Sequence, residues 1–557
     1  MDFIKRTLLV CGGFASVQVA FAQKATNDSV LNRTVVVENQ YNPEVADAFK
    51  INVLPEVEEP ETAKQEIDYA VSSRPLHEWE VRPMAVMLPS VSQRLTPRGY
   101  ARASYGSMGN VDMKGSYLWN VSGRDCIGIM ASMYGRNGDL SHKTAPEDWK
   151  SRFYRTDVSL DYRHDFHRVS LSLGGSFASQ VFNYMPSLGG SGASYTAETD
   201  RQHYTLGEGY VKVASNGEKL PVEFAVQTGF KSFNRKYGGY AMQGGSENII
   251  HTSGYLSGDI NQAQQVGVRL QMDNLIHDAS LQQKDFTLLQ FNPYYTLKNG
   301  QLALRAGASM SLQTANDGGL RVAPDVALDY TFASSYTLFL HLAGGTSLND
   351  FRRLNDVSPY WMQYGGQLCT SYTPIDASVG LKASPVADIS FKLQGGYRIT
   401  KNEVFVLPDT GDDSSLLYAS LMQEKAKVAY VGASVSYAYL DWADFTLSGN
   451  YYAWDVPEGM DGLLLLKPQF AVGFSVRGKV FDNLHAVLDY RYEARKDIAG
   501  SRKANPVNNL CVGAEYELFK RVNVFARLNN LLNKDYFTES GYPEQGLYFM
   551  AGLSCRF

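Results

Sequence analysis

The sequence is poor in cysteine, in positive charge and, beyond its first residues, in long apolar runs. Five cysteines occur among 557 residues, and the nine histidines are scattered. Without a C-x-x-C pair or a histidine cluster, the residues predict neither a zinc site nor a disulfide framework. The net charge of −5 excludes the basic surface that a nucleic-acid-binding protein needs. Four cysteines are interpreted as independent thiols: Cys126, Cys369, Cys511 and Cys555.

A catalytic arrangement is missing as well. His164 and His167 fall in a tight turn, and no nucleophile stands beside a base in the sequence. The loop 408–415 contains Asp409, Asp412 and Asp413, but it lacks the full spacing of a calcium loop, so we interpret it as a solvated acidic loop. We therefore predict a protein that is not an enzyme and that holds no metal and no cofactor.

The N-terminus is a targeting segment. Lys5 and Arg6 precede a short apolar stretch that closes on the small-x-small sequence of residues 20–22. This arrangement predicts a cleaved signal peptide over residues 1–22 and a mature chain that starts at Gln23. Cys11 suggests a lipoprotein, but Val10 before it is too large for the usual lipidation site, so cleavage is favoured.

After the signal peptide, no segment reaches the roughly 20 apolar residues of a transmembrane helix, so an exported chain that spans a membrane must form a closed β-barrel. Aromatic residues make up 12% of the chain, including 35 Tyr, which suits an all-β protein. From about residue 97 the pattern has a period of two, with apolar residues alternating with polar or charged ones. A barrel requires this pattern, because one face meets lipid and the other meets a wet lumen.

Charged residues recur on the second face of strand after strand. They could bind a solute inside the lumen, or they could pair across neighbouring strands and keep the inner wall wet. The sequence leaves both interpretations open for Arg269, Asp273, Lys392, Arg398, Asp489, Arg491 and Glu493.

Tight turns give the strand count. Ten short turn sequences are separated by longer segments that hold two strands and a loop. Together with the first and last strands they predict a transmembrane antiparallel β-barrel of about 22 strands over residues 97–557, with both termini on the short-turn side. The turns lie at 121–125, 164–167, 215–219, 258–262, 298–301, 332–335, 384–388, 440–444, 480–483 and 518–521.

The last residues form an amphipathic strand that ends in Phe. Phe549, Leu553 and Phe557 fall on one face of it. We predict that these three residues carry the C-terminal signal that the outer-membrane insertion machinery reads in barrel proteins.

The same region resembles the last two strands of TonB-dependent receptors. The stretch "VNVFARLNNLLNKDYF", followed by "YPEQGLYFMAGLSCRF", matches the family's penultimate-strand motif and aromatic end. Gln23 after the cleavage site and the tyrosine-rich strands look like Bacteroidota proteins. The resemblance implies an outer-membrane location, contact with outer-membrane lipid and a transport or receptor role. The matching residues are Leu528, Asn530, Leu531, Asn533, Lys534, Tyr536 and Phe557.

The N-terminal part departs from this family. Residues 23–96 are too few for the family's folded plug and lack its Gly-rich, strand-dense pattern. Pro43, Pro55 and Pro60, together with an acidic run over 56–61, predict an extended segment that lies in the periplasm or enters the lumen. A non-transporting role is therefore the alternative function: a membrane-embedded scaffold subunit of a larger outer-membrane assembly.

Two further stretches carry predictions. Thr34, Val35, Val36 and Val37 resemble the family's TonB box, which adds a strand to the energy-coupling protein. If these residues add a strand to a partner, the predicted partner is TonB or another envelope protein. The alternatives are a strand that pairs within this chain and a remnant without a role. Tyr360, Trp361 and Tyr364 gather in a long outer loop, where they predict a contact surface for sugars or protein, or an aromatic girdle at the membrane interface.

Overall fold

The computed structural model describes residues 98–557, except 141–148, 187–199, 217–221, 239–243, 316–317, 363–365, 409–415, 497–504 and 540. The predicted signal peptide 1–22, the segment 23–96 with Thr34–Val37, and the loop residues Tyr364 and Asp409–Asp413 lie outside these described residues. Among the described residues, no helix has the length and apolar character needed to cross a membrane.

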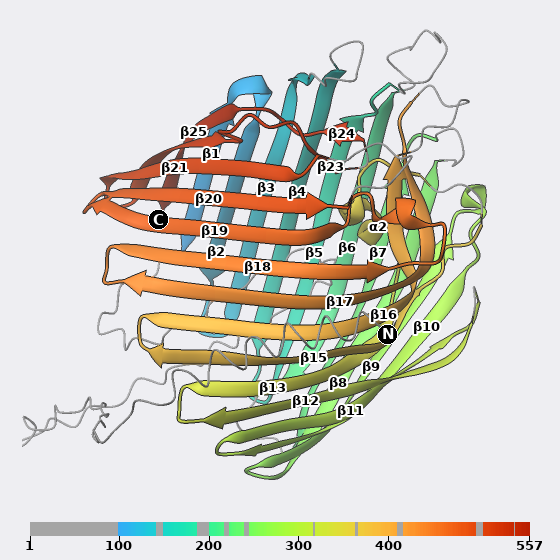
Figure 1. Ribbon diagram of the computed structural model, residues 1–557. Coiled ribbons are helices and arrows are strands. Elements are labelled where there is room, and N and C mark those ends of the chain that lie inside the picture. Colours follow the sequence, from blue (N-terminus) through green and yellow to red (C-terminus); the bar gives the residue numbers. More distant parts are fainter. Residues whose placement is uncertain are drawn as a thin grey trace, which may run out of the picture. The chain divides into compact units, whose positions relative to one another are not determined.

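The described residues form one closed antiparallel barrel (Figure 1). The main sheet has 23 strands, and all of them except the two-residue β14 belong to the barrel wall. β1 pairs with β25 through seven residue pairs from Tyr100–Arg556 to Gly106–Met550, which closes the ring. The prediction of an all-β barrel of about 22 strands is confirmed.

The elements follow one another as simple hairpins. The wall strands are β1 (Gly99–Gly106), β2 (Val111–Asn120), β3 (Asp125–Leu140), β4 (Trp149–Asp165), β5 (Val169–Asn183), β6 (Arg201–Ser215), β7 (Val222–Arg235), β8 (Gly245–Asn261), β9 (Gln264–His277), β10 (Phe286–Asn299), β11 (Leu302–Gln313), β12 (Gly319–Phe332), β13 (Tyr336–Ser347), β15 (Ser371–Val386), β16 (Ile389–Pro408), β17 (Ala419–Tyr439), β18 (Ala443–Asp455), β19 (Pro468–Phe481), β20 (Leu484–Arg495), β21 (Val507–Phe519), β22 (Val522–Asn529) and β25 (Tyr548–Arg556).

Shorter elements lie in the connections. They are η3 (Ser107–Gly109), η4 (Ala279–Leu281), α2 (Phe351–Val357), β14 (Trp361–Met362), η5 (Asp461–Leu464), β23 (Phe537–Glu539) and β24 (Tyr542–Pro543). Apart from η3, which joins β1 and β2, these elements belong to longer connections at one end of the barrel, the long-loop end. Nine of the ten predicted tight turns lie wholly among the described residues, and they join consecutive wall strands at the other end, the short-turn end, where both termini of the barrel also lie. The turn predicted at 215–219 falls partly outside the described residues.

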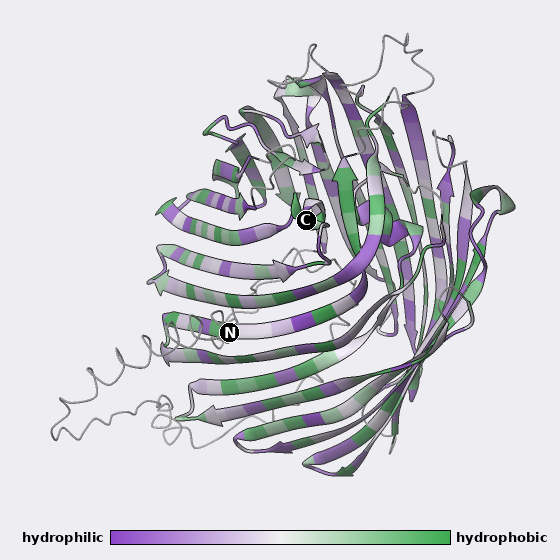
Figure 2. Cartoon of the chain, turned by 45° about the vertical axis from the view of Figure 1, so that its right-hand side comes forward, coloured by the Kyte–Doolittle hydropathy of each residue, from purple (hydrophilic) through white to green (hydrophobic). Residues whose placement is uncertain are grey.

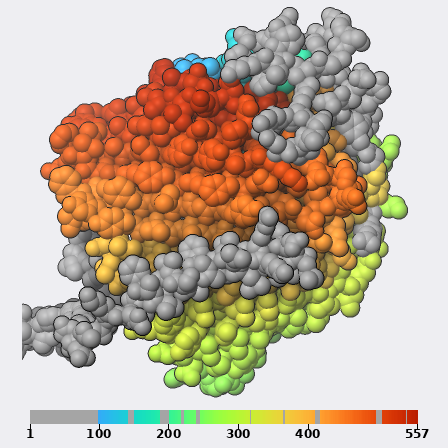
Figure 3. Space-filling view, viewed as in Figure 1, coloured from blue at the N-terminus to red at the C-terminus, as the bar shows by residue number. Residues whose placement is uncertain are grey.

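The two faces of the wall differ as the period of two requires. Phe549 and Leu553 share the outer face of β25 and are 53% and 55% exposed, and Phe557, directly after the strand, is 50% exposed. Figure 2 shows apolar and polar residues alternating along the strands. The outer surface of β17–β22 and β25 is continuous in the space-filling view (Figure 3). Exposed apolar side chains on the outer face, such as Phe549 and Leu553, suit contact with lipid.

The charged inner residues mostly interact across neighbouring strands. Asp273 bonds His251 at 2.6 Å, and Arg269 stands over the ring of Tyr294. Asp489 accepts from Ser475 at 2.7 Å. The sequence left open whether these charged residues bind a solute or pair with neighbours. For several of them the structure shows pairing with side chains of adjacent strands on the same face. Cys126, Cys369, Cys511 and Cys555 are free thiols.

Candidate functional site: the long-loop end of the barrel

Two wall strands are longer than the rest and bend at the long-loop end. β16 has 20 residues and β17 has 21. Their register shifts between Thr400 and Glu403, and Asn402 within the shift has a φ of 55°. A bulge with a left-handed residue bends a strand and redirects the residues beyond it, and Asn tolerates this backbone better than most residues. The bulge separates the part of the hairpin in the wall from the part beyond it.

The far end of this hairpin meets the opposite wall. The backbone N–H of Leu417 donates to the carbonyl of Met185 at 2.8 Å, and Pro186 forms a β-bridge with Leu416. Met185 follows β5, and ten wall strands separate β5 from β17 in either direction around the ring. These bonds therefore join opposite sides of the barrel, and the chain crosses its mouth.

The connection between β13 and β15 enters the same mouth. Its helix α2 begins after Asp350, whose carboxylate accepts from the backbone N–H of Arg353 at 3.0 Å and caps the first turn. Phe351 and Leu354 lie on the buried face of the helix. After the helix, β14 pairs in parallel with the first residues of β17. The connection is thus fixed to the bent hairpin.

Polar contacts hold α2 on the inner wall. The amide of Gln180 on β5 donates to Asn355 at 3.0 Å. The backbone N–H of Phe351 donates to Glu247 on β8 at 2.7 Å, and Arg352 pairs with Glu208 on β6 at 2.8 Å. Contacts with three different wall strands fix both the position and the rotation of this short helix. A seven-residue helix depends on such tertiary contacts for its stability.

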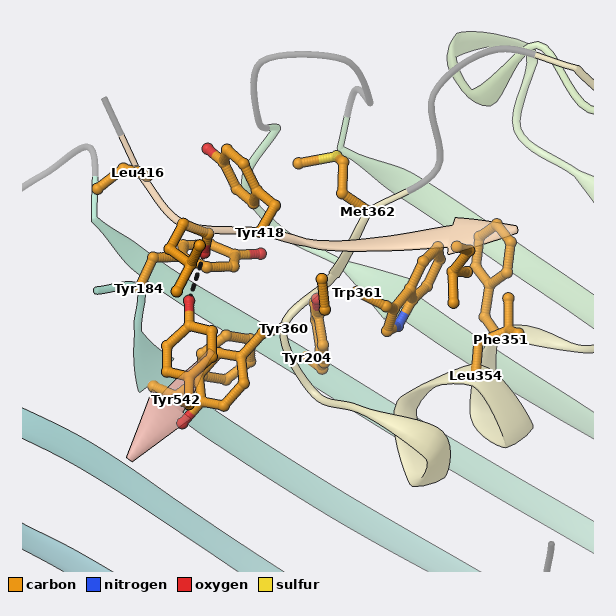
Figure 4. Close-up of a cluster of buried hydrophobic side chains, with 14 of the residues drawn as sticks. Tyr184, Tyr204, Phe351, Leu354, Tyr360, Trp361, Met362, Leu416, Tyr418 and Tyr542 are labelled. Atoms are coloured by element: carbon orange, nitrogen blue, oxygen red, sulfur yellow. Dashed lines mark hydrogen bonds between the residues drawn. The ribbon is translucent and has the colours of Figure 1, made fainter. Parts of the chain in front are cut away.

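Aromatic rings fill the space between these segments (Figure 4). Tyr360 stacks on Tyr542 with 3.5 Å between ring centroids and 7° between planes. Phe182 meets Tyr360 edge to face at 5.2 Å, and the hydroxyl of Tyr542 donates to the carbonyl of Leu417 at 2.5 Å. We call the whole group of buried apolar residues the mouth cluster: Leu140, Trp149, Ala178, Phe182, Tyr184, Met185, Tyr204, Leu206, Phe233, Leu281, Phe351, Leu354, Tyr360, Trp361, Met362, Leu368, Val404, Leu416, Leu417, Tyr418, Ala419, Leu421 and Tyr542.

The structure corrects the expected exposure of the aromatic loop. Tyr360 is 2% exposed and Trp361 is 0% exposed, so neither ring offers a contact surface to a partner or lies in a girdle facing lipid. The reason is that both rings are covered by side chains from β5, α2 and the last long connection. Tyr364, the third residue of that prediction, lies outside the described residues.

A single guanidinium is enclosed in this apolar environment. Arg235, at the end of β7, is fully buried beside the mouth cluster. It donates to the hydroxyl of Tyr184 at 3.3 Å and to the carbonyl of Tyr237 at 3.2 Å, and it stands 5.6 Å from the ring of Trp361. Burial of a charge is tolerated only when hydrogen bonds and aromatic faces replace water. Arg235 therefore ties the wall to the crossing segments.

A pocket of about 650 Å³ opens beside the mouth cluster. Its lining comes from β2 to β5, α2, the residues after α2, and the last long connection with β25. Two loose ion pairs lie along it: Arg136 with Glu544 at 3.8 Å, and Arg155 with Asp356 at 3.7 Å. Both distances are longer than a direct hydrogen bond. Each guanidinium has a closer partner: Arg155 pairs with Asp157 at 3.1 Å, and Arg136 donates to the hydroxyl of Ser151 at 3.1 Å.

Burial changes the acidity of loop carboxyls around the pocket. Burial, aided by nearby Glu544, raises the pKa of Glu539 to about 7, against a hydrogen bond from Ser358 that lowers it. Burial also raises the pKa of Asp356, although Arg155 opposes the change. At neutral pH, Glu539 is therefore partly protonated and can donate as well as accept a hydrogen bond.

No metal centre forms within the part of the chain that the structure describes, since no three His, Cys, Asp or Glu side chains gather there at ligand distances. Apart from Tyr360 and Trp361, sequence reasoning did not single out the residues of the mouth cluster or the pocket. Their one signal was the presence of large apolar residues, such as Phe351 and Tyr542, in connections that would otherwise be polar.

The barrel is similar to solved receptor structures. The ferric enterobactin receptor PfeA of Pseudomonas aeruginosa matches with a TM-score of 0.64 at 12% identity, over 82% of this chain and 81% of that one. The copper transporter OprC matches at 0.60 and 13%, over 83% and 82%. The ferric-catecholate import receptor Fiu of E. coli K12 matches at 0.61 and 12%, over 83% and 82%. No family model and no curated protein matches the sequence.

These neighbours are TonB-dependent receptors, and this chain shares their 22-strand barrel. The expected resemblance is confirmed at the level of the fold.

Proposed function

We propose that the protein is a barrel of the bacterial outer membrane with a receptor or transport role, in which the chain's own mouth cluster controls access to the lumen. A signal peptide over residues 1–22 would direct export, and the insertion machinery would read Phe549, Leu553 and Phe557. In this orientation the long-loop end faces outward, as in outer-membrane barrels generally.

The crossing of the mouth carries this proposal. The bond between Leu417 and Met185 joins opposite sides of the barrel, and the bond between Tyr542 and Leu417 ties the last long connection to the same crossing. A solute that passed from the long-loop end into the lumen would have to displace these segments. The mouth cluster therefore acts as a gate, and the polar inner wall beneath it supplies the wet path that a solute needs.

The contacts that cross the mouth also support a second function, that of a membrane-embedded scaffold. Phe351, Leu354 and Trp361 are all fully buried, and opening the mouth would expose them to water. A barrel that stays shut needs no gate and could serve as a subunit of a larger assembly. The two functions differ in whether the closed mouth ever opens.

Single-channel conductance in a planar bilayer separates them. Four proteins are compared: the mature protein, the same protein lacking residues 23–90, a variant in which residues 349–362 are replaced by a Gly-Ser linker, and a variant that carries both changes. The gate predicts a mature protein that opens rarely and a linker variant that opens often. If the linker variant, correctly folded by heat-shift electrophoresis, stays silent even without residues 23–90, the transport role is contradicted and the scaffold is favoured.

We also propose that Thr34–Val37 couple the protein to TonB by strand addition. Deletion of residues 33–38 should abolish energy-dependent uptake while leaving the barrel assembled. Unchanged uptake in the deletion variant would exclude this coupling.

A further inference from the structure

Positive charge gathers on one side of the short-turn end. Exposed basic residues lie there at the ends of neighbouring wall strands, since β22, β25, β1, β2, β3, β4 and β5 follow one another around the ring. None of these basic side chains forms an ion pair with another described residue. We call this group the basic rim: Arg98, Arg124, Arg168, Lys520, Arg521 and Arg556.

Backbone hydrogen bonds bring several of these bases together. The N–H of Arg556 donates to the carbonyl of Arg521 at 2.8 Å. Gly99, the residue after Arg98, exchanges two hydrogen bonds with Phe557, the residue after Arg556. Like charges on neighbouring strands repel each other, so a carboxylate bound at this place would relieve the repulsion.

The acidic groups near the basic rim do not neutralise it. Asp125 bonds His164 at 2.7 Å, and Asp165 pairs with Arg163 at 2.8 Å. These two carboxylates are therefore already engaged by bases that are not part of the rim. Two further acidic groups offset only part of its charge: Glu517 on β21 and the terminal carboxylate of Phe557.

The opposite side of the short-turn end differs in charge. The described turns after β8, β15 and β17 lie beside exposed carboxylates: Asp259, Asp388 and Asp441. Lys298 stands alone before the turn after β10, and Lys479 is paired with Asp482 at 2.8 Å. A molecule with a negatively charged patch would therefore be attracted to one side of this end and repelled from the other.

The composition of the basic rim favours a polypeptide over a lipid headgroup. Arg556 alternates along β25 with the outward-facing Leu553, so its side chain lies on the lumen side of the wall and not on the lipid side. Phe166 and Phe519, on the same turns as the bases, are 48% and 65% exposed. Arginine and aromatic residues are enriched in protein–protein interfaces, whereas lysine is depleted, and arginine makes up most of the rim.

We infer that the basic rim is the docking surface for an acidic segment of a separate periplasmic polypeptide. Guanidinium groups bind carboxylates with two parallel hydrogen bonds, so successive Asp or Glu side chains of an extended segment would pair with successive arginines of the rim. The inference rests on the proposed function only in placing the short-turn end in the periplasm. It does not depend on whether the mouth opens.

Fluorescence anisotropy of labelled decaglutamate, titrated with the purified full-length mature protein in an uncharged detergent, tests the inference. Labelled decalysine tests the need for negative charge. One variant removes charge from the rim: Arg124→Gln, Arg168→Gln and Arg521→Gln. The matched control removes as many exposed basic charges, also without an ion pair among the described residues, at the long-loop end: Lys150→Gln, Arg152→Gln and Arg201→Gln. A third variant retains the rim charge: Arg124→Lys, Arg168→Lys and Arg521→Lys.

At low salt decaglutamate should bind, and the rim variant with glutamine should weaken its binding by about tenfold or more. The control should change binding by less than about twofold, and the lysine variant should retain most of it. Heat-shift electrophoresis checks that each variant is folded.

The inference is overturned if decaglutamate does not bind, if decalysine binds equally well, or if the two glutamine variants weaken binding equally. A lysine variant that binds no better than the glutamine variant of the rim would also overturn it, because the loss would not follow charge. Binding only by the protein that lacks residues 23–90 would mean that the chain fills the rim itself and would contradict a separate partner. Binding in detergent is independent of conductance, so a failure here leaves the gate untouched, and a silent barrel leaves the rim untouched.

Discussion

The two ends of the barrel are built by different physics. At the short-turn end, the described tight turns join neighbouring strands, and each turn depends on a few consecutive residues. At the long-loop end, residues far apart in the chain converge: Tyr360 stacks on Tyr542, and Tyr542 bonds Leu417. The difference shows that the wall is specified locally, whereas the crossing of the mouth is specified by contacts between residues far apart in the chain.

A substitution of Trp361 should have the largest effect on the long-loop end without affecting the short-turn end. Truncation to alanine removes a fully buried ring from the mouth cluster and should weaken the docking of the crossing segments by about 3–5 kcal/mol. Hydrogen exchange of the amides of residues 416–421 should accelerate, while amides near the tight turns should not change.

Trp442→Ala provides the matched control, because Trp442 is 63% exposed at a tight turn. Its effect on residues 416–421 should stay within about 0.5 kcal/mol. Equal effects from the two substitutions would mean that the ends are not independent.

The next largest effect is expected from the pH dependence of Glu539 protonation. The pKa of Glu539 rises from 4.5 to about 7 in the closed mouth. A carboxyl whose pKa is higher in the folded state than in the unfolded state destabilises the folded state as pH rises above the unfolded-state pKa. The loss of stability is complete above the folded-state pKa. Closure should therefore weaken between about pH 4.5 and 7, by at most about 3 kcal/mol.

Hydrogen exchange of residues 416–421, corrected for the intrinsic pH dependence of exchange, measures this change. Glu539→Gln should flatten the profile, since the amide does not titrate. A profile that keeps its slope in Glu539→Gln would assign the dependence to other groups.

A smaller effect is expected at the bulge in β16. Asn402 has a φ of 55°, which a β-branched residue adopts poorly. Asn402→Val should weaken closure by about 1–2 kcal/mol more than Asn402→Gly, because both lose the side-chain bond to the carbonyl of Thr370 and only valine strains the backbone. Equal exchange rates in the two variants would show that this backbone position does not direct the hairpin.

The smallest effect concerns the short-turn end. Gly300 has a φ of 53° in the turn between β10 and β11. Gly300→Ala should cost about 1 kcal/mol in global thermal stability and leave exchange at residues 416–421 unchanged. A change at the mouth from this distant turn would contradict the separation of the two ends.

The wall could be predicted from the sequence because its signals are local. Alternation in segments such as 264–273, the Asn-Gly pair at 299–300 and the terminal Phe557 each report on their own neighbourhood. These signals were sufficient for the strand order and the even strand count.

The mouth could not be predicted, because its contacts have no local signal. Tyr360 looked like an exposed loop residue, since nothing near it in the chain shows that Phe182 and Tyr542 cover it. The pocket depends on Gln545 and Asn110, which are 435 residues apart in sequence. Such pairs emerge only when the ring of strands has closed.

Thiol labelling from outside the cell tests the closed mouth most directly. Cys126 is the second residue of β3, at the short-turn end and opposite Arg163, and it lies on the same strand face as Arg136 in the pocket. The variants retain this thiol and carry serine at 369, 511 and 555, and they also lack residues 23–90. A large polyethylene-glycol maleimide that cannot cross the outer membrane is added to intact cells.

If the crossing segments close the barrel, Cys126 should not be labelled with the native mouth and should be labelled rapidly when residues 349–362 are replaced by a Gly-Ser linker. Equal labelling of both proteins would contradict the claim that the crossing segments close the barrel.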